Sequence, residues 1–240
     1  MNKFIKNVDI DHRAEELISR YEQISGLTVK PPVPIEQILL QSCKLYVAWD
    51  EIEENDDYKI LGGLSPLMNT IVLNTLHKDL FENISGLERS TIGHEAGHWE
   101  YDIDKGSIGQ PQLFDVDKRE MYLRSISKKY GEITIYRSNR LPSSTRPTKS
   151  ITDRLIDTPD QSRIVNRFAG ALNMPNHLIS EAIKQNDISS WPNLYKLREK
   201  FDVSISALTV RLQQLNYIYL EGKKIHRSKA EALGQETLGF

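Results

Sequence analysis

Residues 90–98 read STIGHEAGH, and the two histidines of this stretch, His94 and His98, are four positions apart. On an α-helix, residues four apart lie on one face, so both imidazoles can converge on a single ion. Zn²⁺ accepts neutral histidine nitrogen at about 2.0–2.1 Å. Glu95 points in a neighbouring direction, from which it can take a proton from the attacking water without occupying the coordination sphere. The pattern predicts a helix that carries a metal centre and a general base.

The simplest alternative is a surface helix that bears two histidines for no chemical reason. The surrounding sequence favours the metal centre. Small and apolar residues precede His94, and Gly97 allows another element to approach the helix closely. The four other histidines, at positions 12, 77, 177 and 226, have no spacing suited to a metal. A β-hairpin is expected just before the helix, and zinc peptidases hold an extended substrate against such a strand. These features favour a metallohydrolase.

The composition is that of an ordinary soluble globular protein of one or two domains. The chain has 240 residues, of which 39% are hydrophobic and 27% are charged, which excludes disordered and fibrous classes. No apolar run approaches the roughly 18 residues that span a bilayer, so we expect no contact with a membrane. The first residues lack the apolar stretch of a signal peptide. Cys43 is the single cysteine, so no intramolecular disulfide can form. A cytoplasmic location is expected.

Charge is unevenly distributed along the chain. Residues 1–104 carry 9 basic and 19 acidic side chains, whereas residues 105–150 carry 10 basic and 4 acidic ones. The basic segment is interpreted as a solvated insertion; a lid or a docking surface for protein or nucleic acid is the alternative.

Hydrophobic periodicity predicts helices and strands that alternate in the first half of the chain and helices in the second. Strands are expected at 44–49, 59–64 and 70–74, the last two as a hairpin. Helices are expected at 12–24, 34–40, 88–101, 160–172, 176–184, 192–201 and 205–215. The stretch 103–159 has weak periodicity, and its segment 140–149 is typical of a mobile loop.

The C-terminal tail resembles a helix-turn-helix followed by a small hairpin wing. Its second helix, SISALTVRLQQL at residues 204–215, carries Arg211 as its single basic residue. Recognition helices contact DNA through several polar and basic side chains. We therefore favour a helical pair that packs on the preceding domain, with DNA binding as the alternative.

Several segments resemble, in order, the ImmA/IrrE family of bacterial metallopeptidases. They are PPVPIEQIL at 31–39, ILGGL at 60–64 with TIVLN at 70–74, RSTIGHEAGHW at 89–99, and NRFAGALNMP at 166–175. The resemblance covers most of the chain and rests on the order and spacing of these segments.

The resemblance implies an α+β fold: a zincin-like metallopeptidase domain with a small sheet over residues 1–187, including an insertion at 103–159. A helical, winged-helix-like tail follows over 188–240. It implies Zn²⁺ held by His94 and His98, Glu95 as general base, and Asn166 as support for a histidine ring.

The implied function is intracellular endoproteolysis of a transcriptional repressor that has its own helix-turn-helix, which derepresses stress or mobile-element genes. The substrate is expected to add as a strand beside residues 70–74. The alternative is a catalytically impaired peptidase fold that binds a repressor protein or DNA.

The third metal ligand is left open. The family carries a glutamate four residues before the asparagine of its second motif, and this chain has Ser162 there. A serine hydroxyl is a poor substitute for a carboxylate, and catalytic zinc normally keeps three protein ligands. Asp102, Asp157, Asp160, Gln161, solvent and residues of the insertion all stay candidates.

Overall fold

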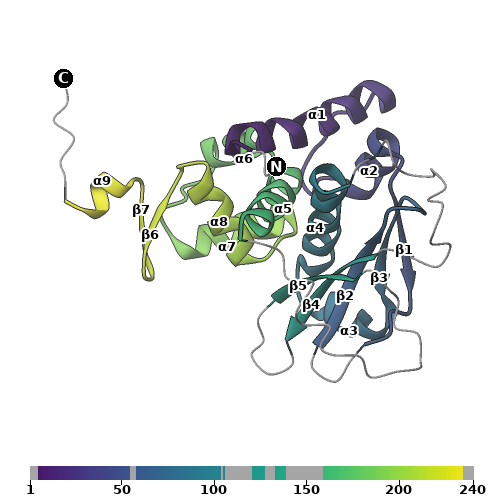
Figure 1. The fold of residues 1–240 in the computed structure, drawn as a ribbon. Coiled ribbons are helices and arrows are strands. Elements are labelled where there is room, and N and C mark those ends of the chain that lie inside the picture. The colour runs from purple at the N-terminus through teal and green to yellow at the C-terminus, as the bar shows by residue number, and fades with distance from the viewer. Residues whose placement is uncertain are drawn as a thin grey trace.

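The computed structural model describes residues 5–54, 58–103, 105, 121–127, 133–138 and 159–234. It is a mixed α+β structure in which a five-stranded sheet packs beside a layer of helices, and the chain ends in a protruding hairpin and short helix (Figure 1). Within the described residues, every helix is too short or too polar to cross a lipid bilayer. The expected loop at 140–149 lies outside the described residues.

The N-terminal half alternates helices with strands. Helix α1 (Asn7–Ser25) is amphipathic and ends at Gly26, whose left-handed backbone (φ 71°) suits glycine. Helix α2 (Ile35–Cys43) follows the proline-rich entry predicted from the sequence. The next elements are β1 (Tyr46–Asp50), β2 (Tyr58–Ser65), β3 (Thr70–Asn74), a 3₁₀ turn η1 (Thr75–His77), α3 (Lys78–Asn83) and α4 (Leu87–Tyr101).

The sheet has the strand order β1-β3-β2-β4-β5. Strands β2 and β3 form the expected hairpin, while β1 pairs parallel to β3 with Tyr46 opposite Thr70. Strand β3 therefore has a neighbour on each side. The expectation that a substrate adds beside residues 70–74 is wrong, because β1 already occupies that edge. In the described sheet, the outer strands are β1 and β5.

Two strands, β4 (Met121–Ser127) and β5 (Ile133–Ser138), lie in the stretch 103–159, which was expected to be an insertion. They form an antiparallel pair, and β4 also pairs antiparallel with β2. The register between β2 and β4 shifts between Ile60 and Gly62, as at a β-bulge. The segment thus supplies two of the five strands.

The C-terminal half is helical and ends in a small hairpin. Its elements are α5 (Pro159–Asn173), α6 (Asn176–Lys184), α7 (Trp191–Phe201), α8 (Ile205–Gln214), β6 (Tyr219–Glu221), β7 (Lys224–His226) and α9 (Lys229–Ala232). Buried residues of α7 and α8 belong to the same hydrophobic cluster as those of α1, α4 and the sheet. A domain boundary near residue 187 stays a prediction.

Glycines on α4 allow an unusually close contact with α5. A Cβ atom at Gly97 would lie 2.8 Å from Cα and 2.9 Å from Cβ of Val165. One turn earlier, a Cβ at Gly93 would lie 3.1 Å from the Cβ of Ala169. The residues pair in opposite chain directions, so α4 and α5 are antiparallel at this contact.

We predict that Gly97→Ala destabilises the protein, although alanine favours helix. The new methyl group meets backbone atoms of Val165, and overpacking of this kind costs about 1–3 kcal/mol. Gly170→Ala on α5 is the matched control, because its added Cβ would lie 3.7 Å from Cδ of Arg211, an ordinary van der Waals distance. The control is expected to be neutral or stabilising by up to about 1 kcal/mol. Denaturant unfolding measures both; equal stabilities would contradict the packing argument.

A buried ionic contact ties the tail to the first helix. Asp11 of α1 accepts hydrogen bonds from Arg167 of α5 and, at 2.9 Å, from Nη1 of Arg211 on α8. Nε of Arg211 also donates to the carbonyl oxygen of Met174 at 3.0 Å. The Arg211 side chain is 1% exposed. The single basic residue of the expected recognition helix is therefore occupied inside the protein.

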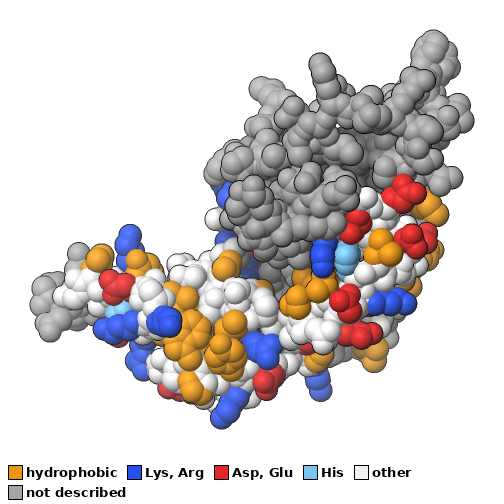
Figure 2. All heavy atoms as spheres, turned by 90° about the horizontal axis from the view of Figure 1, so that it is seen from below, with side chains coloured by type: hydrophobic (Ala, Val, Ile, Leu, Met, Phe, Trp, Pro, Cys, Tyr) orange, Lys and Arg blue, Asp and Glu red, His pale blue; other side chains and the backbone are white. Residues whose placement is uncertain are grey.

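Unlike Arg211, other basic side chains of the tail lie on its surface. Figure 2 shows blue side chains around the tail end of the molecule and mostly red ones at the opposite end. The exposed basic residues of the tail are Lys196, Lys200, Lys223, Lys224, Arg227 and Lys229. All six lie outside α8, the helix that was compared with a recognition helix, and four of them follow it in the chain.

We predict that Asp11→Ala destabilises the protein by about 3 kcal/mol or more, because the change leaves two arginines without their shared carboxylate. Asp9→Ala, an exposed acidic change in the first turn of α1, is the control and should cost less than about 1 kcal/mol. Thermal or urea unfolding measures the stability of both variants. If Asp11→Ala costs as little as Asp9→Ala, the contact does not hold the tail.

Candidate metal centre

Helix α4 places the histidine pair, defined as His94 and His98, in the interior of the molecule. His94 is fully buried and His98 is 1% exposed. Thr91, one turn earlier, packs against Gly62 of β2, so this side of the helix faces the sheet. The close approach of α5 on the adjoining side places the histidine pair between the sheet and α5.

Each histidine is held through its Nδ1 atom. Nδ1 of His94 lies 3.0 Å from Oδ1 of Asn166 on α5, and Nδ1 of His98 lies 2.6 Å from Oδ2 of Asp102. A carbonyl-type or carboxylate oxygen only accepts hydrogen bonds, so Nδ1 is the donor in both rings. In a neutral imidazole the other nitrogen, Nε2, then carries the lone pair.

The Nε2 atoms of His94 and His98 face each other. Nε2 of His94 and Nε2 of His98 are 3.0 Å apart, and the rings are inclined by 71°. Two nitrogens that bind one zinc ion at about 2.0–2.1 Å are roughly 3.3–3.4 Å apart at the tetrahedral angle, and a separation of 3.0 Å corresponds to a narrower angle of roughly 95°. A proton on one Nε2 makes this contact a hydrogen bond between the rings, and with both rings neutral a bound cation can share the two lone pairs. In the second case the histidine pair can hold a zinc ion at this narrower angle.

Glu95 is fully buried next to the histidine pair. As the residue after His94, it lies about 100° further round the helix. A buried carboxylate beside two imidazoles is suited to exchange protons with a water molecule at the same site.

No group of three or more histidine, cysteine, aspartate or glutamate side chains able to hold a metal occurs among the described residues. Ser162 is half-buried on α5, one turn before Asn166. Gln161 is also half-buried on this helix. Asp157 and the side chain of Asp160 lie outside the described residues. The third ligand stays open.

Asp102, one of the residues left open as a ligand, lies behind His98. Its carboxylate contacts Nδ1, on the opposite side of the ring from Nε2. It is the residue after the last turn of α4 and caps the helix C-terminus. The i, i+4 spacing from His98 was visible in the sequence, but that spacing does not tell which ring nitrogen the carboxylate meets. Asp102 thus supports a ligand and is not itself placed as one.

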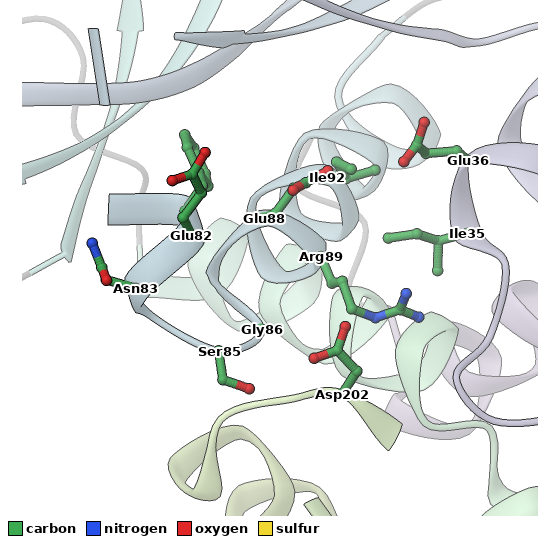
Figure 3. A pocket seen from close by; sticks show the side chains of 11 residues that line it. Ile35, Glu36, Glu82, Asn83, Ser85, Gly86, Glu88, Arg89, Ile92 and Asp202 are labelled. Carbon is green, nitrogen blue, oxygen red and sulfur yellow. The ribbon is translucent and has the colours of Figure 1, made fainter. Parts of the chain in front are cut away.

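A separate cavity of about 410 Å³ opens on another face of α4. Ile92 and Glu88 line it, and Ile92 is two residues from His94, so the two sites lie on nearly opposite sides of the helix. Figure 3 shows Arg89 and Asp202 facing each other in this cavity. Burial and the negative charge of Glu36 raise the pKa of Glu88. This cavity is distinct from the histidine pair.

No protein-family model matches this sequence, and no curated protein is significantly similar to it.

We predict that the protein binds one zinc ion per chain and that His98→Ala removes most of the affinity. The loss should exceed the ~10–100-fold typical of residues that only support a ligand. His12→Ala is the control, because His12 is 70% exposed on α1. Elemental analysis and chelator competition measure both variants. Absence of stoichiometric zinc from the wild type after reconstitution would overturn the assignment.

Proposed function

We propose that this chain is an intracellular zinc-dependent endopeptidase of the ImmA/IrrE type, with a zincin-like domain. The observation that carries the proposal is the convergence of the two Nε2 atoms at 3.0 Å, with both Nδ1 atoms engaged elsewhere. Glu95 on the same helix provides the base that peptide hydrolysis needs. Resemblance of the sequence motifs supports the same family.

Different residues of the chain have different roles in peptide hydrolysis. Bound zinc supplies Lewis acidity, which polarises a peptide carbonyl and lowers the pKa of water. Glu95 accepts the proton of the attacking water and passes it to the leaving amine nitrogen. Asn166 and Asp102 keep the two imidazoles oriented. Burial of His94, Glu95 and His98 limits their contact with bulk water and strengthens their electrostatic interactions, while Asn166 is exposed and Asp102 is partly buried.

The edge strand that suits a substrate is β5. Helix α4 contacts β2, β3 and β4, and α2 contacts both α4 and β1. In Figure 1, α2 and β1 lie on one side of α4, and α5 lies on the other. Asn166 on α5 marks the side of α4 where the histidine pair lies. Since β5 is the sheet edge opposite β1, an extended peptide added to β5 would pass closer to the histidine pair than one added to β1.

The substrate class follows from the resemblance. We propose a transcriptional repressor with its own helix-turn-helix, whose cleavage derepresses stress or mobile-element genes. The outer edge of β5 requires an extended stretch of backbone, so cleavage would fall in a linker or an unfolded segment of that repressor.

A second candidate is a catalytically impaired module that binds a regulatory protein. Serine at position 162 favours it, because the family glutamate would have supplied the third ligand. DNA binding is the weaker form of this candidate, since Arg211 of α8 is buried against Asp11 and Met174.

We predict that Glu95→Gln abolishes proteolysis of the cognate repressor while zinc stays bound. The amide keeps the shape of the side chain but cannot accept the proton, and loss of a general base lowers the rate by ~10²–10⁴-fold. Glu88→Gln, seven residues and about two turns nearer the start of the same helix, is the control and should keep wild-type activity. Product formation is followed by mass spectrometry.

The same Glu95→Gln variant tests where the repressor binds. A photo-crosslinker in β5 should attach to the bound repressor, and one in β1 should not. Cleavage at the wild-type rate by Glu95→Gln would refute the mechanism, and a wild type that binds zinc and repressor but never cleaves would favour the binding module.

A further inference from the structure

The two histidines are supported by chemically different partners. His94 donates to a neutral amide oxygen of Asn166, whereas His98 donates to the carboxylate of Asp102. The second contact is shorter, 2.6 Å against 3.0 Å, as expected for a hydrogen bond to an ionised acceptor. The Asp102 side chain is 15% exposed, so solvent screens this contact only in part.

The position of Asp102 is unfavourable for the helix that carries it. The C-terminal end of a helix has partial negative charge, and an acidic side chain there is repelled. Asp102 follows Tyr101, the last residue of α4, and its own backbone N–H donates to the carbonyl of His98. Helix stability therefore does not account for a carboxylate at this point, while contact with Nδ1 of His98 does.

We infer that Asp102 is a positioning residue of the metal centre and supplies, from behind His98, negative charge that Ser162 cannot supply as a ligand. This inference rests on the proposed zinc site. A carboxylate partner fixes the tautomer and orientation of a ligating imidazole and makes its other nitrogen a stronger donor. The amide behind His94 fixes the ring equally well but adds no charge.

Position 162 is the natural place to test the charge argument. Val165 meets Gly97 and Asn166 meets His94 across the antiparallel contact of α4 and α5. Ser162, one turn nearer the start of α5, is therefore level with the turn of α4 that holds His98. A glutamate at this position would bring a carboxylate close to the turn of α4 that holds His98.

The experiment measures zinc affinity of the full-length protein by competition with a chelator. Asp102→Asn keeps an oxygen acceptor for Nδ1 but removes the charge, and it should weaken zinc binding ~10–100-fold. Asp102→Glu should restore part of the affinity. Glu88→Gln removes one negative charge from the separate cavity, six residues before His94 on α4, and should leave zinc affinity unchanged. Ser162→Glu should tighten binding, and combined with Asp102→Asn it should recover most of the loss.

Thermal unfolding of the metal-free proteins separates positioning from a structural role. Metal-free Asp102→Asn should unfold at the wild-type temperature or above it, because the change removes an unfavourable charge from the helix end. Parallel losses of metal-free stability and zinc affinity would overturn the inference, as would wild-type zinc affinity in Asp102→Asn. A double variant that Ser162→Glu does not rescue would overturn the charge argument.

The role of Asp102 and the proposed peptidase function can fail independently of each other. A wild type that binds zinc, with Asp102→Asn unchanged, refutes the role of Asp102 and leaves the peptidase proposal standing. Weaker zinc binding in Asp102→Asn without any proteolysis by the wild type supports the role of Asp102 and refutes the peptidase. A wild type that takes up no zinc refutes both.

Discussion

The close contact between α4 and α5 is the constraint on which the candidate site depends. Gly93 and Gly97 leave room for Ala169 and Val165. The two backbones approach so closely that a Cβ atom at either glycine would be too close to α5. Asn166, next to Val165, then reaches Nδ1 of His94. With a larger residue at position 97, the helices would separate and the ring of His94 would lose its partner. The geometry of the histidine pair is thus a consequence of helix packing.

Orientation of the rings carries the chemical meaning. Two buried histidines on one helix face are compatible with ordinary core packing, in which their nitrogens bond to separate partners. Here both Nδ1 atoms donate to oxygen and both Nε2 atoms converge. Such an arrangement is favourable when a cation shares the two lone pairs. The same logic separates Asp102 from a ligand, because its carboxylate lies on the Nδ1 side.

Local patterns in the sequence predicted most helices and the central hairpin, because apolar spacing and proline or glycine signals act over a few residues. The helix at 176–184 has the predicted bounds, and that at 88–101 begins one residue earlier, at Leu87. Pairing between distant strands could not be read this way. The parallel pairing of β1 with β3 closes the edge where a substrate was expected. Strands β4 and β5 were missed although alternation in ITIYRS, residues 133–138, was a usable signal.

The candidate site was predictable in its residues but not in its geometry. Helical spacing identifies His94 and His98 as neighbours, yet it leaves open which nitrogens face each other. Nuclear magnetic resonance of the ring nitrogens, through long-range ¹⁵N–¹H coupling in the zinc-loaded protein, tests this point directly. The account predicts Nδ1–H tautomers for both rings and zinc-dependent shifts of both Nε2 resonances. Metal-shifted Nδ1 resonances, or Nε2–H tautomers that zinc does not alter, would contradict it.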